Sequence, residues 1–221
     1  MQHRFVFLLT LFIVLATSVH LRLWASLDGD VLYALQATLP RVVDVPFSLL
    51  SLLGSAEITV LIFLPIVWFA RTEQRIPLFV AFGLVTVLEL GGKLLIAQPE
   101  TPDELLRYAF RTGMPSGKLG TGFSFPSGHM ARTTFLVIIL MQMISTSRWN
   151  AVSRKLGYAT LIIIAGLMFI SRIYLADHWL TDVLGGALLG GACAVLALQW
   201  NAKSFNRLVR KFFDRDVSWG S

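Results

Sequence analysis

Long hydrophobic blocks recur along the whole chain, and they constrain its fold more than any other feature of the sequence. A transmembrane helix needs about 20 predominantly apolar residues, and five blocks approach or exceed that length. They run over residues 5–23, 47–70, 76–97, 156–173 and 179–200. A sixth, shorter block over residues 131–144 opens on polar residues, which predicts that its first turn lines a protein-facing site. The sequence therefore predicts an all-α, polytopic membrane bundle of about six transmembrane helices.

Composition and charge distribution exclude several other classes of protein. Hydrophobic residues make up 55% of the chain and charged residues 14%, whereas soluble domains are about a quarter charged. The formal net charge is +6, but the Lys and Arg residues cluster where apolar blocks end, which indicates membrane orientation rather than nucleic-acid binding. Because no polar linker separates the blocks, we expect a single membrane-embedded domain over residues 1–221.

The flanking segments and the lone cysteine have simple interpretations. The first apolar block is longer than the h-region of a typical signal peptide, so we expect it to be retained as a membrane anchor rather than cleaved. Residues 28–44 are mildly amphipathic and predict an interfacial helix. The basic tail over residues 201–221 predicts a cytoplasmic segment lying against anionic lipid. Cys193 lies in an apolar block, so we expect it to be a packing residue. Because it is the single cysteine, the chain can form neither an internal disulfide nor a multi-cysteine metal site.

The positions of Lys and Arg predict the orientation in the membrane. If the N-terminus is inside, the inner loops and the tail carry a modest excess of basic residues. Both termini are then cytoplasmic in the cell (inner) membrane. The loops that join the third to the fourth span and the fifth to the sixth span face the extracytoplasmic side, and these loops carry the candidate chemistry.

Four polar side chains stand where apolar blocks meet that outer surface. They are Lys93, His129, Arg172 and His178. A single Lys or Arg at a helix end often only extends its charge to the headgroups. Several such groups on one side of the membrane indicate a functional site instead, since charge near hydrocarbon is unfavourable.

Two local patterns suggest roles for the histidines. His178 and Asp182 are four residues apart and share one helix face, so the carboxylate can hold one imidazole nitrogen and make the ring a competent nucleophile or general base. The alternative is that His178 and Asp182 are only a polar pair at a helix end, without a role in chemistry.

Ser127, Gly128 and His129 form a turn that runs into a helix, where free backbone N–H groups favour the binding of an anion. His129 could protonate a leaving oxygen, or only cap or pack the loop.

These residues resemble the signature motifs of a known family. Pro126-Ser127-Gly128-His129, and Ser171-Arg172 followed after five residues by His178 and after three more by Asp182, resemble the second and third motifs of the type 2 phosphatidic acid phosphatase superfamily. The resemblance implies that His178 attacks phosphorus, that Asp182 orients it and that His129 protonates the leaving alkoxide. Water then cleaves the phosphohistidine. Lys93, Ser127, Gly128 and Arg172 would hold the phosphate, with no metal and no other cofactor.

The first motif departs from the family pattern. In the family the Lys is followed after six residues by Arg-Pro, but Lys93 is followed by a segment that ends in Gln98-Pro99-Glu100. The expected arginine is absent, which removes one phosphate ligand. Replacements are conceivable at four positions, of which Arg132 and Arg111 are preferred; the others are Arg107 and Lys118.

The expected function is hydrolysis of a lipid-linked phosphate or diphosphate. Polyprenyl diphosphate, phosphatidylglycerol phosphate and phosphatidate are candidate substrates by resemblance, and the bilayer is the expected partner. A phosphotransferase that passes the phosphoryl group to a lipid acceptor is the alternative. A non-catalytic protein that binds or transports lipid phosphates is a weaker one. The oligomeric state stays open, because the small-residue face of Gly186 and Gly190 could pack within or between chains.

Overall fold

The computed structural model describes residues 2–109 and 122–200, and regular structure in these ranges is entirely helical. The predicted all-α class is therefore confirmed. The helices are α1 (Gln2–His20), α2 (Ala25–Thr38), α3 (Asp44–Gly54), α4 (Ala56–Phe69), α5 (Thr72–Leu95), α6 (Gly128–Ser145), α7 (Ala151–Tyr174) and α8 (Leu180–Gln199), with the short 3-10 helices η1 (Arg41–Val43) and η2 (Asp103–Leu105).

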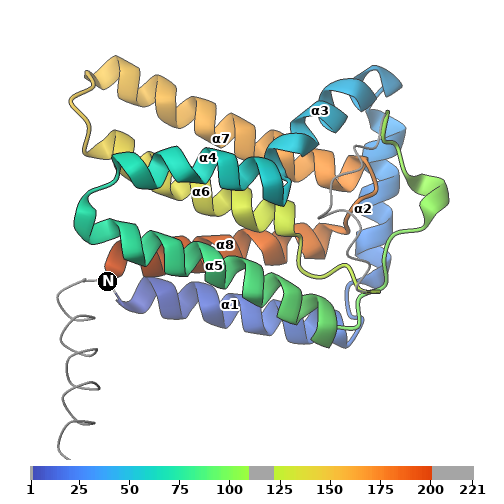
Figure 1. Ribbon diagram of the computed structural model, residues 1–221. Helices are drawn as coiled ribbons and strands as arrows, with labels where there is room; N and C mark the ends of the chain where they lie inside the picture. The colour runs from blue at the N-terminus through green and yellow to red at the C-terminus, as the bar shows by residue number, and fades with distance from the viewer. Residues whose placement is uncertain (1, 110–121, 201–221) are drawn as a thin grey trace, which may run out of the picture.

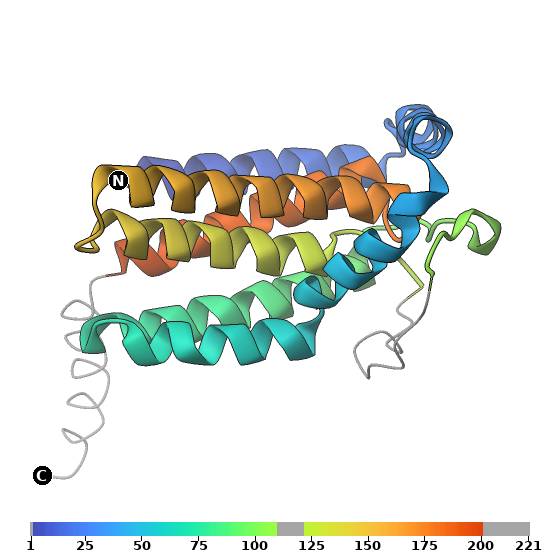
Figure 2. The ribbon, with the colours of Figure 1, turned by 90° about the horizontal axis from the view of Figure 1, so that it is seen from above.

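The long helices run side by side along one axis, and α2 lies across one end of the bundle (Figures 1 and 2). Helix α8 packs against α6, α1 and α5. Glycines make the α8–α6 contact close: a Cβ on Gly186 would overlap the carbonyl oxygen of Ser127, and one on Gly190 would overlap that of Ala131. The predicted small-residue face therefore serves packing inside the chain.

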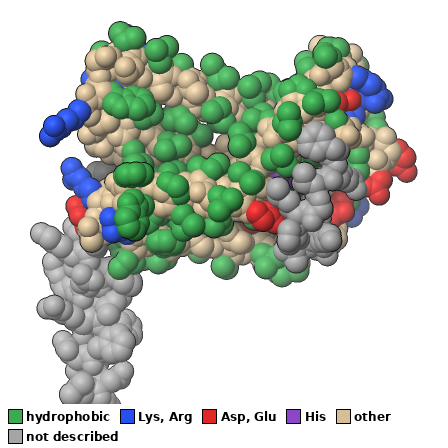
Figure 3. All heavy atoms as spheres, turned by 45° about the horizontal axis from the view of Figure 1, so that its top comes forward, with side chains coloured by type: hydrophobic (Ala, Val, Ile, Leu, Met, Phe, Trp, Pro, Cys, Tyr) green, Lys and Arg blue, Asp and Glu red, His purple; other side chains and the backbone are tan. Residues whose placement is uncertain are grey.

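The protein is a multi-pass integral membrane protein. In the part of the chain that the structure describes, five helices are long and apolar enough to span a membrane, namely α1, α5, α6, α7 and α8. A sixth is obtained if α2 and the segment Arg41–Gly54, which meet at a 100° bend, form one broken span. Figure 3 shows hydrophobic side chains over the middle of one face and Lys and Arg side chains at its ends. This surface fits a bilayer, and the expected count of about six spans is confirmed.

The predicted second span over residues 47–70 is wrong in one respect, because it is not one helix. Helix α3 ends at Gly54 and α4 begins at Ala56, with Ser55 between them in extended conformation. The Ser55 hydroxyl accepts a hydrogen bond from the backbone N–H of Ile58, as an N-cap does. Hydropathy cannot detect this break, since both helices are apolar. With 14 residues, α4 is about 21 Å long, shorter than the hydrocarbon core.

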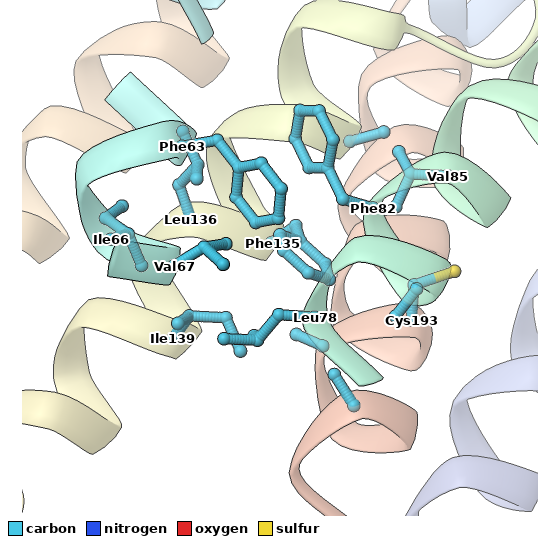
Figure 4. Close-up of a cluster of buried hydrophobic side chains, with 14 of the residues drawn as sticks. Phe63, Ile66, Val67, Leu78, Phe82, Val85, Phe135, Leu136, Ile139 and Cys193 are labelled. Atoms are coloured by element: carbon cyan, nitrogen blue, oxygen red, sulfur yellow. The ribbon is translucent and has the colours of Figure 1, made fainter. Parts of the chain in front are cut away.

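The main hydrophobic core lies where α4, α5, α6 and α8 meet. Phe63 stacks on Phe82 with ring centroids 4.2 Å apart, and Phe135 meets Phe82 edge-on at 5.6 Å (Figure 4). Such pairs add about 0.5–1.5 kcal/mol beyond the burial of their area. Cys193 is buried in the same cluster, which confirms its prediction as a packing residue.

The helix ends that carry the candidate residues all lie at one end of the bundle. These are the C-terminal ends of α5 and α7 and the N-terminal ends of α6 and α8 (Figure 1). The expected interfacial helix corresponds to α2, which lies across this same end. The single-domain assignment stays a prediction, and the basic tail over residues 201–221 lies outside the described residues.

Candidate active site

Two imidazoles from distant parts of the sequence meet at this end of the bundle. His129 lies in the first turn of α6, and His178 lies in the turn between α7 and α8. Each ring offers a nitrogen, and Asp177 offers a carboxylate oxygen, with these atoms within 4.8 Å of one another. The motifs that the sequence separates therefore form one site.

His178 stands against the first turn of α8. Its Nδ1 is 3.5 Å from Oδ2 of Asp182, a fully buried carboxylate. The same oxygen accepts a hydrogen bond from the backbone N–H of Trp179 at 3.0 Å. The 3.5 Å separation is long for a hydrogen bond, and such contacts commonly tighten when substrate binds. Asp182 thus caps α8 and faces the imidazole, which leaves Nε2 of His178 on the side of Asp177.

Arg172 is fully buried in the last turn of α7. Its Nη1 donates hydrogen bonds to the hydroxyl oxygens of Ser51 at 2.7 Å and Tyr108 at 2.8 Å, and to Oδ2 of Asp177 at 3.3 Å. The two hydroxyls fix the guanidinium without neutralising it. Asp177 is the carboxylate that pairs with the guanidinium, so an Arg172–Asp177 ion pair lies next to the paired imidazoles.

Ser51, Tyr108 and Asp177 are site residues that the sequence analysis missed. Ser51 belongs to a polar stripe with Ser48 and Ser55 in an apolar block, a signal that could have been noticed. Tyr108 lies in the segment after η2 and has no local sequence signal. Burial, reinforced by the charge of Asp177, raises the pKa of Tyr108 to about 12, so its hydroxyl stays protonated.

Asp177 sits in a tight turn that wraps around the end of α7. The backbone N–H groups of Asp177 and His178 both donate to the carbonyl oxygen of Arg172, at 3.1 and 3.2 Å. Ala176 has φ 53°, in the left-handed region that residues other than glycine rarely adopt. Burial raises the pKa of the Asp177 carboxyl, but His178, Arg172 and His129 outweigh it and hold the pKa well below its usual value.

A second charged cluster lies beside the first turn of α6. Glu89 has Oε1 3.3 Å from Nζ of Lys93 and Oε2 2.5 Å from Nη1 of Arg132. Arg132 also donates from Nε to the carbonyl oxygen of Gly54 at 3.2 Å. Glu89 and Lys93 are four residues apart on α5, the spacing at which side chains of one helix face can pair. Two predicted phosphate ligands, Lys93 and Arg132, thus share one carboxylate of the chain itself.

Ser127 and Gly128 shape the turn before His129. The Ser127 hydroxyl caps α6 by accepting from the N–H of Met130 at 3.4 Å, and its own N–H donates to the carbonyl oxygen of Asp182 at 2.9 Å. A Cβ on Gly128 would overlap the carboxylate of Glu89. The space next to Gly128 is therefore filled by a side chain of the protein itself.

Of the remaining candidates for the missing arginine, the structure describes Arg107. Arg107 donates to the carbonyl oxygen of Gln36 at 2.9 Å and lies over the ring of Tyr174 at 5.1 Å, so it holds α2 against the end of α7. Arg111 and Lys118 lie outside the described residues. Glu100, which follows Pro99 in the divergent first motif, is exposed.

The donor set of His129, Asp177 and His178 could in principle hold a divalent metal. Arg172 disfavours this, because its buried guanidinium already binds the one carboxylate of the set. The electrostatics fit an anion better than a cation. The expected absence of metal and cofactor stays a prediction.

Fold and site together define a class: a multi-pass helical membrane protein with imidazole and guanidinium groups gathered at one end of its bundle. The chain matches the PAP2 superfamily over residues 74–206, and it belongs to this superfamily. The predicted resemblance to the type 2 phosphatidic acid phosphatases is therefore confirmed.

Two curated relatives match part of the chain. Phosphatidylglycerophosphatase B of Bacillus subtilis (strain 168) is 36% identical over 93 residues, covering 42% of this chain and 43% of that protein. Lipid A 4'-phosphatase of Bacteroides thetaiotaomicron is 31% identical over 102 residues, covering 46% of this chain and 40% of that protein. The match spans less than half the length of either relative.

Two solved structures share the fold over a larger part of the chain. The transmembrane PAP2 type phosphatidylglycerolphosphate phosphatase from Bacillus subtilis has a TM-score of 0.70 at 23% identity, covering 99% of this chain and all of that one. Aquifex aeolicus LpxE has a TM-score of 0.60 at 24% identity, covering 79% and 96%. At these identities the likeness concerns the fold alone.

Proposed function

We propose that this protein is a membrane lipid phosphatase that hydrolyses a lipid-linked phosphate or diphosphate through a phosphohistidine intermediate. The observation that carries the proposal is the meeting of His129 and His178, with nitrogens within 4.8 Å of a common carboxylate, beside the buried Arg172. Membership of the PAP2 superfamily and the names of both curated relatives support it.

The reaction runs in two displacements on phosphorus. Nε2 of His178 attacks phosphorus while the bond to the lipid oxygen breaks, and His129 donates its proton to that oxygen. Asp182 faces Nδ1 at 3.5 Å and stabilises the charge that develops on the ring. A water molecule then attacks the phosphohistidine, with His129 accepting its proton, and releases inorganic phosphate and free His178.

The remaining predicted residues bind the phosphate. Arg172 supplies a fixed positive charge, and Ser127 and Gly128 contribute the first turn of α6, where backbone N–H groups favour an anion. Lys93 and Arg132 supply further positive charge, and each interacts with both Glu89 and the bound phosphate. Arg111 is a second candidate for the missing arginine of the first motif. No metal takes part in the proposed reaction.

The substrate is an amphiphile whose chain stays in the bilayer. The charged cluster lies at one end of apolar helices, so a terminal phosphate reaches it from the headgroup level. Phosphatidylglycerol phosphate, polyprenyl diphosphate and phosphatidate are the candidates, and the first agrees with the name of one curated relative.

We place the site on the extracytoplasmic face of the cell membrane and both termini in the cytoplasm. The α4–α5 and α6–α7 connections lie at the end of the bundle opposite the site (Figure 1). These connections and the beginnings of α5 and α7 carry basic residues with few acidic ones nearby, namely Arg71, Arg75, Arg148, Arg154 and Lys155. Cytoplasmic loops are enriched in such residues, which supports this orientation. The lack of a polar linker between the apolar blocks supports a single domain that spans the bilayer.

Phosphate release from purified protein tests the proposal. We expect the protein to release inorganic phosphate from phosphatidylglycerol phosphate or another lipid phosphate without a second lipid, with chelator present. His178→Ala should abolish release. Dependence on a lipid acceptor would favour the phosphotransferase, loss of activity with chelator would overturn the metal-free mechanism, and binding without release would favour the non-catalytic alternative.

A further inference from the structure

The first turn of α8 depends on another part of the chain for one of its hydrogen bonds. The N-cap residue is Trp179, whose indole carries no hydrogen-bond acceptor for the free N–H groups of the helix start. Asp182 accepts from the N–H of Trp179 itself. The N–H of Thr181 therefore needs an acceptor from outside α8.

Asp28 of α2 supplies that acceptor. Its Oδ1 accepts from the backbone N–H of Thr181 at 2.9 Å, and its Oδ2 accepts from the Thr181 hydroxyl at 2.7 Å. The side chain of Gln98 also donates to Oδ2, at 3.1 Å. Asp28 is only 2% exposed. A buried carboxylate 153 positions away in the sequence thus takes the part of an N-cap side chain, at the helix end whose dipole favours negative charge.

These bonds lie next to the proposed chemistry. Thr181 directly precedes Asp182, whose Oδ2 is 3.5 Å from Nδ1 of His178. Among the residues that the structure describes, Nδ1 of His178 and Oδ1 of Asp182 are buried without a hydrogen-bond partner. The position of the carboxylate relative to the ring therefore depends largely on the backbone that carries both residues.

Helix α2 also holds the other side of the same turn. Gln36 donates from Nε2 to the carbonyl oxygen of Tyr174, the last residue of α7, at 2.9 Å. Asp28, Leu32 and Gln36 are spaced four residues apart and share one face of α2, with Leu32 fully buried between the two polar residues. Helix α2 lies across the end of the bundle where α7 and α8 meet (Figure 1). It thus binds both helix ends that the His178 turn connects.

We propose, on the basis of the proposed function, that Asp28 is a positioning residue. It fixes the first turn of α8 so that Asp182 faces the ring of the nucleophile His178. A helix end without its cap frays, and misplacement of a reacting group by about 1 Å can lower the rate by about a hundredfold. Asp28 acts on the ring only through Thr181 and Asp182.

Two substitutions separate the hydrogen bonds of Asp28 from its charge. Asp28→Asn keeps an oxygen that can accept from the Thr181 N–H, so its kcat should stay within about threefold of the wild type. Asp28→Ala removes the acceptor, and we expect kcat to fall at least about tenfold with little change in KM, because positioning acts on the chemical step. A wild-type kcat in Asp28→Ala overturns the proposal. Equal losses in both variants would assign the effect to the charge and overturn it as well.

A matched control removes a helix cap elsewhere. The Asn150 side chain caps α7 by accepting from the backbone N–H of Ser153 at 2.8 Å. This cap lies at the end of the bundle opposite the site (Figure 1). Asn150→Ala should therefore leave kcat as in the wild type. If it lowers kcat as far as Asp28→Ala does, the effect is one of general destabilisation, and the proposal fails.

A double-mutant cycle tests the route through Asp182. In an Asp182→Asn background, Asp28→Ala should lower kcat by less than about threefold, because the carboxylate that Asp28 positions is already gone. Losses that multiply in full would mean that Asp28 acts independently of Asp182, which contradicts the proposal.

Hydrogen exchange separates this proposal from the phosphatase function, because it needs no turnover. Asp28→Ala should speed amide exchange over residues 179–183, and Asp28→Asn should not. If the wild type releases phosphate from no lipid phosphate, the proposed function fails, while exchange still decides whether Asp28 holds this turn. Should Asp28→Ala fail to fold, Asp28→Ser replaces it, since its hydroxyl is one bond too short to reach the Thr181 N–H. Wild-type exchange in that variant overturns the proposal.

Discussion

The backbone N–H of Ser127 donates to the carbonyl oxygen of Asp182 at 2.9 Å. This hydrogen bond joins the residue before α6, the helix that carries His129, to the first turn of α8, the helix that follows His178. The glycines of α8 make the approach possible, since a Cβ on Gly186 would overlap the carbonyl oxygen of Ser127. The geometry of the paired imidazoles therefore depends on how closely two helices pack, as well as on the residues of the site.

Substitution of Gly190 should destabilise the bundle far more than the same change next to it. A Cβ on Gly190 would overlap the carbonyl of Ala131, whereas one on Gly191 would have its first neighbour at 3.7 Å. We expect Gly190→Ala to lower the free energy of unfolding by about 1–3 kcal/mol through overpacking. Gly191→Ala is the control. Thermal unfolding in detergent measures both, and equal stability of the two variants would contradict the helix contact described above.

Asp182→Asn should impair the chemical step while preserving the fold. The amide oxygen can still accept from the N–H of Trp179, but it no longer stabilises a charged His178 ring. We expect kcat to fall by about a hundredfold or more with little change in KM. The unfolding temperature serves as the control, and a variant with wild-type kcat would remove Asp182 from the mechanism.

Arg132→Ala tests the replacement of the missing first-motif arginine. Loss of the guanidinium leaves Glu89 with Lys93 as its cationic partner and removes positive charge beside the first turn of α6. We expect turnover to fall at least about tenfold, equivalent to ~1.4 kcal/mol. Arg107→Ala removes a guanidinium that is bonded to Gln36 and is the matched control. If neither Arg132→Ala nor Arg111→Ala reaches this effect, the replacement hypothesis is wrong.

The stability contributed by Asp177 should depend on pH in the acid range. Its folded-state pKa lies below the ordinary value of 3.8. The ionised carboxylate therefore stabilises the fold fully above the unfolded pKa, and this contribution is lost as the pH falls toward the folded value. Unfolding temperatures of the wild type and Asp177→Asn should differ by a constant amount above about pH 5 and converge below it. A difference that grows toward acid pH would reverse the assigned sign.

Local patterns predicted the parts of this protein that depend on local chemistry. Helix parity predicted that Lys93, His129, Arg172 and His178 lie at one end of the bundle, and the spacing of His178 and Asp182 predicted their shared face. The break at Ser55 was not predicted, because a serine cap inside an apolar block leaves the hydropathy almost unchanged.

By itself the sequence determined the helical class, the approximate number of spans and the motifs of the superfamily, because burial in lipid and residue spacing along a helix are properties of short segments. Only the tertiary structure decided which groups meet. It brought Ser51 and Tyr108 to Arg172, Glu89 to Arg132 and Asp177 to the two imidazoles. Such contacts depend on the rotation and separation of packed helices, which no single segment of the sequence encodes.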